Sequence, residues 1–166
     1  EYLAAMSDEQ FTDTVMVPEL VEAGLMAEGE RSRAWLTTLA SVVRPRTKHL
    51  GDVPGICSMV FATADTLAYE DKAVSKGLAK EGMAAVLDAA ASALQAVSED
   101  GWNATSIDEA LEALPEQLDV KKRLVFQAIR AAVCGNLVSP PLGVVIELVG
   151  KEDALARIER AKGMAL

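Results

Sequence analysis

Residues 121–161 are a succession of helix start and stop signals, and they constrain the fold more than any other part of the chain. Basic residues lead into an apolar helix that Gly135 ends, and a short loop follows as far as Ser139-Pro140-Pro141. A second apolar helix then runs to Gly150, and a charged helix comes after it. Ser139 is suited to cap the second helix and Pro140 to its first position, where a missing N–H is no loss. This stretch therefore predicts three helices joined by short loops.

The composition is that of an all-α protein. Hydrophobic residues make up 51% of the chain, many of them alanine, whereas aromatic residues make up only 4%. Alanine and leucine favour helices, and no alternating strand pattern is present. No apolar stretch reaches the ~18 residues that a membrane span needs, so we expect no membrane association.

Earlier helices are predicted from the capping box that begins at Ser7 to about Gly24, over 31–43, and from about residue 52. Residues 62–80 are polar and are interpreted as a linker or two short helical turns. Further helices are predicted over 81–98 and from a second capping box at Thr105 to about Leu118, with Pro115 expected to kink or shorten the end of the latter. The predicted organisation is two packed helical subdomains, residues 1–68 and 69–166.

Charge is unevenly distributed along the chain, whose net charge is −9. Residues 1–30 and 81–119 contain acidic but no basic residues, whereas 31–48 and 120–135 contain basic but no acidic ones. Two basic segments thus lie between acidic blocks. Such a pattern suits a local phosphate-binding surface that avoids indiscriminate binding, although segregated charges on solvated helices would look the same.

Nothing in the sequence predicts catalysis or metal binding. Cys57 and Cys134 stand apart in apolar surroundings, without zinc-ligand spacing, so we expect buried, reduced thiols in a cytoplasmic protein. His49, the single histidine, is interpreted as a surface residue, and Glu109 and Glu112 as a solvated pair. The chain begins at Glu1 and is interpreted as part of a longer protein.

The order of signals over 121–161 resembles the C-terminal region of bacterial glutamyl-tRNA synthetases. That family has a Lys-x-x-x-Phe…Gly-x-x-x-Ser-Pro-Pro-Leu pattern followed by Leu-Leu-Gly-Lys-Glu. Here the corresponding residues run from Lys122 and Phe126 through Gly135 and 139–142 to Gly150-Lys151-Glu152. Residues 42–50, Val-Val-Arg-Pro-Arg-Thr-Lys-His-Leu, are similar to the family's Leu-Val-x-x-Arg-x-Lys-Thr-Leu segment.

This resemblance implies an anticodon-binding helical cage that recognises tRNA(Glu), and possibly tRNA(Gln), within a class I synthetase. The parent enzyme would join glutamate to tRNA with ATP and Mg²⁺, which would bind its own N-terminal catalytic domain. The signature motifs of that domain are absent from this sequence, so the fragment itself is expected to hold no cofactor and to be inactive. We expect a monomer that does not bind DNA.

Eight residues are the predicted tRNA contacts. They lie in the two basic segments and at the Ser-Pro-Pro turn: Arg44, Arg46, Lys48, Lys121, Lys122, Arg130, Ser139 and Pro140. The two segments are expected to converge on one face. Each residue also has a purely structural interpretation: Arg44 and Arg46 as helix-end charges, the lysines as solvated charges, and Arg130 as the partner of a core carboxylate.

One departure from the family pattern concerns packing. Gly143 stands where the family often has a bulky residue, which predicts a shallow depression at the start of that helix. Three alternatives to the anticodon-binding function stay open: a helical protein-interaction module, a small carboxylate enzyme, and the equivalent domain of a related class I synthetase such as a lysyl-tRNA synthetase.

Overall fold

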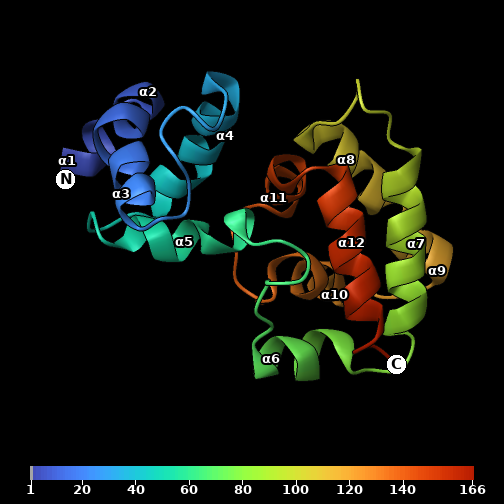
Figure 1. The fold of residues 1–166 in the computed structure, drawn as a ribbon. Helices are drawn as coiled ribbons and strands as arrows, with labels where there is room; N and C mark the ends of the chain where they lie inside the picture. The colour runs from blue at the N-terminus through green and yellow to red at the C-terminus, as the bar shows by residue number, and fades with distance from the viewer. Residues whose placement is uncertain (1) are drawn as a thin grey trace. The chain divides into compact units, whose positions relative to one another are not determined.

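The computed structural model describes residues 2–166, and every regular element in that range is helical (Figure 1). The predicted all-α fold class is confirmed. The chain forms two compact units, one ending at Phe61 and the other running from Ala62 to Leu166. Within residues 2–166, no helix combines the length and the apolar character that crossing a bilayer requires.

The first unit ends seven residues before the predicted boundary at residue 68. Residues 62–68 belong to the second unit because hydrogen bonds attach them to its last helix. The Ala62 carbonyl accepts from Arg157 at 2.5 Å, and the Ala64 amide donates to Asp153 at 3.0 Å. These partners are about ninety residues away, so composition alone did not indicate them.

Over residues 2–61, the first unit contains seven helical elements. They are α1 (Tyr2–Ala5), α2 (Asp8–Phe11), the π-helix η1 (Thr12–Met16), α3 (Val17–Glu22), α4 (Arg33–Val43), the 3-10 turn η2 (Arg44–Arg46) and α5 (Asp52–Phe61). The predicted capping box is present: the Ser7 side chain accepts from the Gln10 amide, and the Gln10 side chain accepts from the Ser7 amide. The wide turns of η1 precede Pro18, whose ring would clash with a carbonyl four residues earlier in a regular α-helix.

The core of the first unit forms where α4 packs against η1 and α5. Phe11, Met16, Leu20 and Val43 are wholly buried there. Pro45 ends α4, as the sequence predicts, and the chain continues as η2. The basic residues that follow α4 are thus attached to a packed helix end.

The second unit contains eight elements. They are α6 (Asp71–Ala73), the π-helix η3 (Val74–Leu78), α7 (Met83–Ala96), α8 (Ala104–Glu112), α9 (Leu114–Leu118), α10 (Lys122–Cys134), α11 (Leu142–Val149) and α12 (Lys151–Lys162). Helices α7 and α12 lie side by side, and α10 contacts both of them as well as η3. Leu87, Ile129 and Ile158 are wholly buried in this core.

The helix predicted from a capping box at Thr105 to Leu118 differs in the structure. Asn103, not Thr105, is the cap: its side chain accepts from the Ser106 amide at 2.9 Å. The interruption expected at Pro115 is present: the helix is divided into α8 and α9 just before this residue, which lacks the N–H that would continue the helical ladder. The predictions that Gly135 and Gly150 end their helices are correct, and both have positive φ, 69° and 87°.

Candidate nucleic-acid interface

The first basic segment follows α4 and is held by hydrogen bonds at both ends. The buried Thr47 hydroxyl donates to the Val43 carbonyl at 2.9 Å. Farther along, the Asp52 carboxylate accepts from the backbone amides of Lys48 and His49 at 3.0 and 2.8 Å. The hydrogen bond from the His49 amide, and then that from Lys48, lower the pKa of Asp52. The segment therefore presents its side chains from a fixed backbone.

Arg44 and Arg46 differ in their surroundings although only Pro45 separates them. Arg44 is half-buried, and its Nε donates to the Asp8 carboxylate at 2.7 Å, which ties α2 to the end of α4. Arg46 is exposed, and its Nη1 donates to the Val42 carbonyl at 3.1 Å. The Arg46 side chain is nevertheless exposed, so a ligand such as RNA can reach it.

A groove of about 460 Å³ adjoins this segment within the first unit. Lys48, His49 and Leu50 line it together with Tyr2, Leu3, Met6, Thr14 and Val15. Lys48 is exposed beside it. The groove thus combines apolar walls with a cationic rim.

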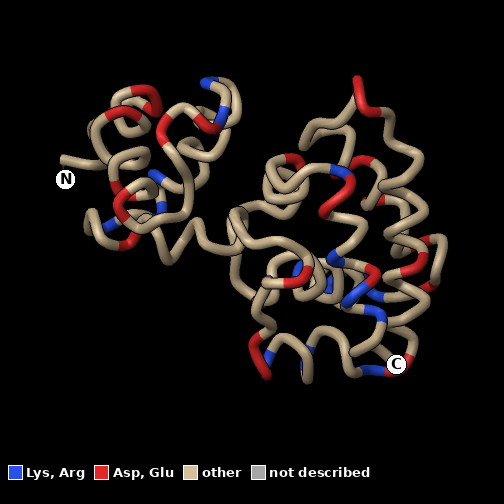
Figure 2. The backbone as a smooth tube through the Cα atoms, viewed as in Figure 1, with Lys and Arg blue, Asp and Glu red and all other residues tan. Residues whose placement is uncertain are grey.

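The second basic segment begins at α10. Lys121 is exposed just before the helix, and Lys122 forms an ion pair with Glu112 at 2.9 Å. Glu109 and Glu112 are both exposed, as predicted for a solvated pair, and Glu112 additionally has Lys122 as a basic partner. Figure 2 shows basic residues along α10 and along the segment between α6 and α7.

The Ser-Pro-Pro turn differs from its prediction. Ser139 does not cap a helix: α11 begins at Leu142, and no side chain caps it. Pro140 is not the first helical residue. It is followed by Pro141, and a residue that is followed by a proline is biased away from helical geometry. Pro140 is also buried.

Ser139 instead joins the turn to α10. Its hydroxyl oxygen accepts from the Arg130 Nε at 3.0 Å and donates to the Pro140 carbonyl at 2.8 Å. Two predicted contacts, Arg130 and Ser139, are thus brought together. Arg130 is half-buried and donates to a serine, in place of the core carboxylate considered from the sequence.

Gly143 leaves no depression, in contrast to its prediction. The carboxylate of Asp108 lies over this buried glycine, and a Cβ added there would be 2.3 Å from Asp108 Oδ1. Burial, and then the nearby Glu112, raise the pKa of Asp108. Asp108 of α8 thus lies at the start of α11, and a carboxylate of α11 lies at the start of α8: Glu147 accepts from the Ala104 backbone amide at 2.9 Å. Each of the helices α8 and α11 therefore has an acidic side chain near the first turn of the other.

Arg157 has a structural role that sequence reasoning missed. It is wholly buried, and its guanidinium donates to the Asp153 carboxylate at 2.8 Å, the Val133 carbonyl at 2.8 Å and the Ala62 carbonyl at 2.5 Å. The signal was present in the sequence: residues 154, 157, 158 and 161 have the 3–4 spacing of a buried helix face, and all four are buried.

Neighbouring side chains extend this attachment of residues 62–70. Arg160 donates to the carbonyls of Ala64 and Leu67 at 2.6 and 2.8 Å, and its guanidinium lies 4.9 Å from the Tyr69 ring centre. The Tyr69 hydroxyl lies 2.7 Å from the Ala132 carbonyl. We call Arg157, Arg160 and Tyr69 the clamp. The clamp fixes the end of α10, from which the loop to Ser139 departs.

The burial predicted for the two cysteines is confirmed. Both are buried and free, and burial raises the pKa of the Cys57 thiol to about 12 and also raises that of Cys134. Among residues 2–166, no three His, Cys, Asp or Glu side chains group as metal ligands would.

A helical domain that presents arginines and lysines from fixed helix ends has the features of an RNA-binding module. Residues 9–162 match the family described as the anticodon binding domain. The match covers most of the chain, so the chain belongs to that family, and the resemblance predicted from the sequence is confirmed.

Curated relatives of this chain are glutamate–tRNA ligases. That of Bifidobacterium adolescentis is 41% identical over 131 residues, which cover 78% of this chain and 26% of the relative. That of Clavibacter michiganensis is 34% identical over 165 residues, covering 98% of this chain and 32% of the relative. This chain therefore spans about a third or less of the length of these relatives.

Solved structures support the fold. A glutamate tRNA ligase from Elizabethkingia meningosepticum, in complex with its amino acid, aligns over 98% of this chain and 30% of its own, with a TM-score of 0.83 and 21% identity. The glutamate–tRNA synthetase of Elizabethkingia anophelis aligns with a TM-score of 0.78, also at 21% identity.

Proposed function

We propose that this chain recognises the anticodon loop of tRNA(Glu), and of tRNA(Gln) in a non-discriminating enzyme, as part of a glutamate–tRNA ligase. The observation that carries this proposal is the match of residues 9–162 to the anticodon-binding family, whose relatives here are glutamate–tRNA ligases. The two basic segments, set in a chain of net charge −9, are consistent with it.

Arg46 is the residue that we propose reads an anticodon base. It is exposed at the end of a packed helix, and arginine can contact a base edge with two hydrogen bonds or stack on an unpaired base. Arg44 is engaged by Asp8 and is assigned to holding that helix end in place. Lys48, Lys121 and Lys122 are assigned to phosphates.

Arg130 and Ser139 are proposed to contact RNA together. Their mutual hydrogen bond fixes the direction of the guanidinium before RNA arrives, which reduces the entropy cost of binding. Pro140 is buried and is assigned to shaping the turn, without touching RNA itself.

We also propose that catalysis occurs elsewhere in the parent. ATP and Mg²⁺ would bind a catalytic domain outside this chain, while this chain positions the tRNA for it. The parent would act in the cytoplasm as a monomer.

The test is tRNA affinity measured with tRNA(Glu), tRNA(Gln) and an unrelated tRNA. Arg46→Ala should remove about 1–3 kcal/mol of discrimination between cognate and unrelated tRNA, the worth of one bidentate base contact. Arg33→Ala is the matched control, because Arg33 is an exposed arginine of the same unit that pairs with Asp13. It should leave discrimination unchanged.

Two results would count against the proposal. If the chain binds no tRNA at low salt, the proposed tRNA-binding function is wrong. If Arg46→Ala loses the same affinity for cognate and unrelated tRNA, Arg46 does not read a base, although the chain would still be a tRNA-binding domain.

A further inference from the structure

The second unit has two basic stretches that are close in space, and four of their cations, Lys72, Lys76, Lys80 and Arg123, have no role assigned so far. Residues 72–80 contain three lysines and no acidic residue, and residues 120–135 contain four basic residues and no acidic one. These residues are Lys72, Lys76, Lys80, Lys121, Lys122, Arg123 and Arg130.

The two stretches are adjacent in space because η3 packs against α10. The approach is close at Gly77: a Cβ built there would lie 2.8 Å from the Ala131 Cβ and 3.3 Å from the Gln127 carbonyl oxygen. Only a glycine allows the backbone of η3 to lie this near α10. The lysines on either side of Gly77 are therefore held next to the basic helix.

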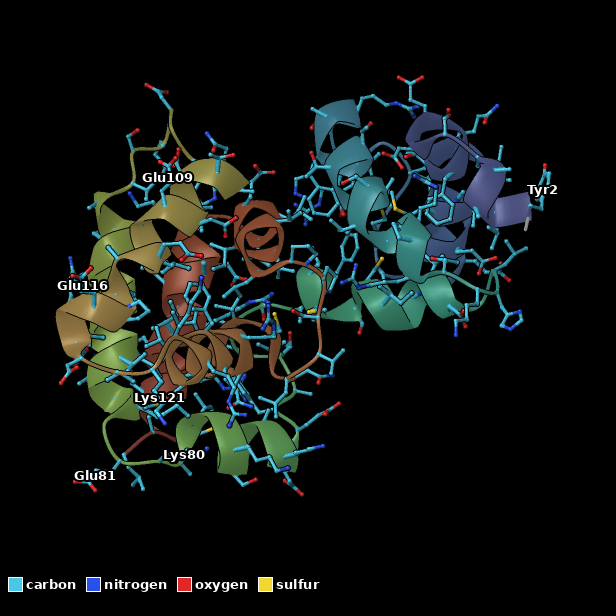
Figure 3. The ribbon with its side chains drawn as sticks, turned by 180° about the vertical axis from the view of Figure 1, so that it is seen from behind. Tyr2, Lys80, Glu81, Glu109, Glu116 and Lys121 are labelled. Carbon is cyan, nitrogen blue, oxygen red and sulfur yellow. The ribbon has the colours of Figure 1, made fainter. Side chains whose placement is uncertain are left out.

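On α10 itself, the arginines lie on the side away from the core. Arg123, Gln127 and Arg130 follow the i, i+4, i+7 spacing of one helix face, whereas Val125 and Ile129 are wholly buried. The two arginines are about 10 Å apart along the helix axis. We call this arginine row and Lys72, Lys76 and Lys80 the basic strip. Figure 3 labels Lys80, just after η3, and Lys121, just before α10.

Much of the strip has no protein partner. Lys72, Lys76 and Arg123 are exposed, and the charged groups of their side chains form no hydrogen bond or ion pair with any residue from 2 to 166. The acidic residues nearest in sequence are Glu70, Asp71 and Glu81 for the lysines and Asp119 for Arg123. The Glu70 carboxylate accepts from the Asn136 side-chain amide at 3.1 Å.

We propose that the basic strip binds the phosphodiester backbone of the tRNA outside the anticodon bases. This inference rests on the proposed function and extends it. Several like charges held side by side repel one another, and a row of phosphates relieves that repulsion. Lysine makes point-charge contacts without bidentate geometry, so the strip contributes affinity and orientation while base contacts contribute specificity.

The experiment compares Lys72→Gln/Lys76→Gln with the unaltered chain by measuring tRNA affinity from low to physiological salt. Removing one phosphate-binding cation should reduce the slope of log K against log salt by about one, so the double variant should lower it by about two. Affinity should fall by the same factor for cognate and unrelated tRNA, because backbone contacts carry no sequence information.

The matched control is Arg33→Gln/Lys162→Gln. It changes net charge by the same two units, from −9 to −11, but at cations outside the strip that pair with Asp13 and with Asp88 and Glu159. Its salt slope should stay close to that of the unaltered chain. Circular dichroism and urea unfolding establish that both double variants are folded.

Each possible outcome decides the inference. An unchanged salt slope in the strip variant overturns the inference, and so do equal slope changes in the strip and control variants. A competition assay gives a further test: if poly-glutamate displaces the tRNA as well as RNA does, the inference is also overturned. If Arg46→Ala still loses discrimination in that case, the proposed function stands without the strip. A chain that binds no tRNA overturns both.

Discussion

The clamp and the basic strip lie in the same unit and are both built around cations, yet their cations have opposite surroundings. Arg157 is wholly buried and has a carboxylate and two carbonyls as acceptors. Lys72, Lys76 and Arg123 are exposed and form no ion pair with the described residues. A fully satisfied cation serves the fold, whereas a cluster of unpaired cations is available to a ligand. Charge alone therefore does not separate the two roles, whereas burial together with the acceptors of a cation separates Arg157 from the exposed cations of the strip.

The largest expected effect is at the clamp. Arg157→Met should lower the free energy of unfolding by about 3–5 kcal/mol, because it breaks a buried pair and leaves the carbonyls of Val133 and Ala62 without their donor. Urea unfolding measures it. The matched substitution Arg123→Met in the strip should stay within about 0.5 kcal/mol. Similar losses for both arginines would break the comparison.

The next effect tests how closely residues 62–70 approach α10. Gly135 has a φ of 69°, and a Cβ there would lie 2.0 Å from the Ala68 carbonyl oxygen. Gly135→Ala should cost about 2–4 kcal/mol, from the left-handed conformation together with overpacking.

Gly24→Ala is the control for that substitution. Its φ is 74°, but no atom lies within 4 Å of the added Cβ. It should cost only the conformational part, about 1–2 kcal/mol. Equal losses in thermal or urea unfolding would mean that the close approach of residue 68 contributes nothing.

The smallest expected effect is on thermal stability and concerns an acidic residue, Asp108, in place of the cations compared above. Burial and Glu112 raise the pKa of Asp108 in the folded chain, and its carboxylate accepts no hydrogen bond from the described residues. Asp108 therefore holds a proton more readily in the folded state than in the unfolded state. The folded state is more stable when Asp108 is protonated at low pH, and it loses that stability as pH rises through the raised pKa. Asp108→Asn should therefore raise Tm slightly at pH 7, and the gain should vanish below about pH 4. A gain that is independent of pH would contradict this assignment.

Local signals predicted much of the fold. The capping box at Ser7, the end of α4 at Pro45 and the helix ends at Gly135 and Gly150 are all as expected, because each depends on a few neighbouring residues. Long-range interactions were not predictable in this way. The domain boundary depends on bonds from residues 62–64 to α12, and Ser139 accepts a hydrogen bond from Arg130 instead of capping a helix.

In the candidate site, too, local features were predictable from the sequence and long-range contacts were not. The sequence located the basic segments, but it treated Arg44 and Arg46 as equivalent, and the difference depends on Asp8, thirty-six residues before Arg44. The lysines of 72–80 were not predicted, because they lie in a polar stretch that had the features of a linker. Their proximity to α10 depends on the packing of η3.

The absence of a side chain at Gly77 sets the spacing between two rows of positive charge. Because the η3 backbone lies directly against α10, the lysines that flank Gly77 lie on or next to an element in contact with the helix that carries the arginine row. A single methyl group at this position would widen the spacing between the two rows without altering any charge. Residue 77 thus determines which width of polyanion can touch both rows at once.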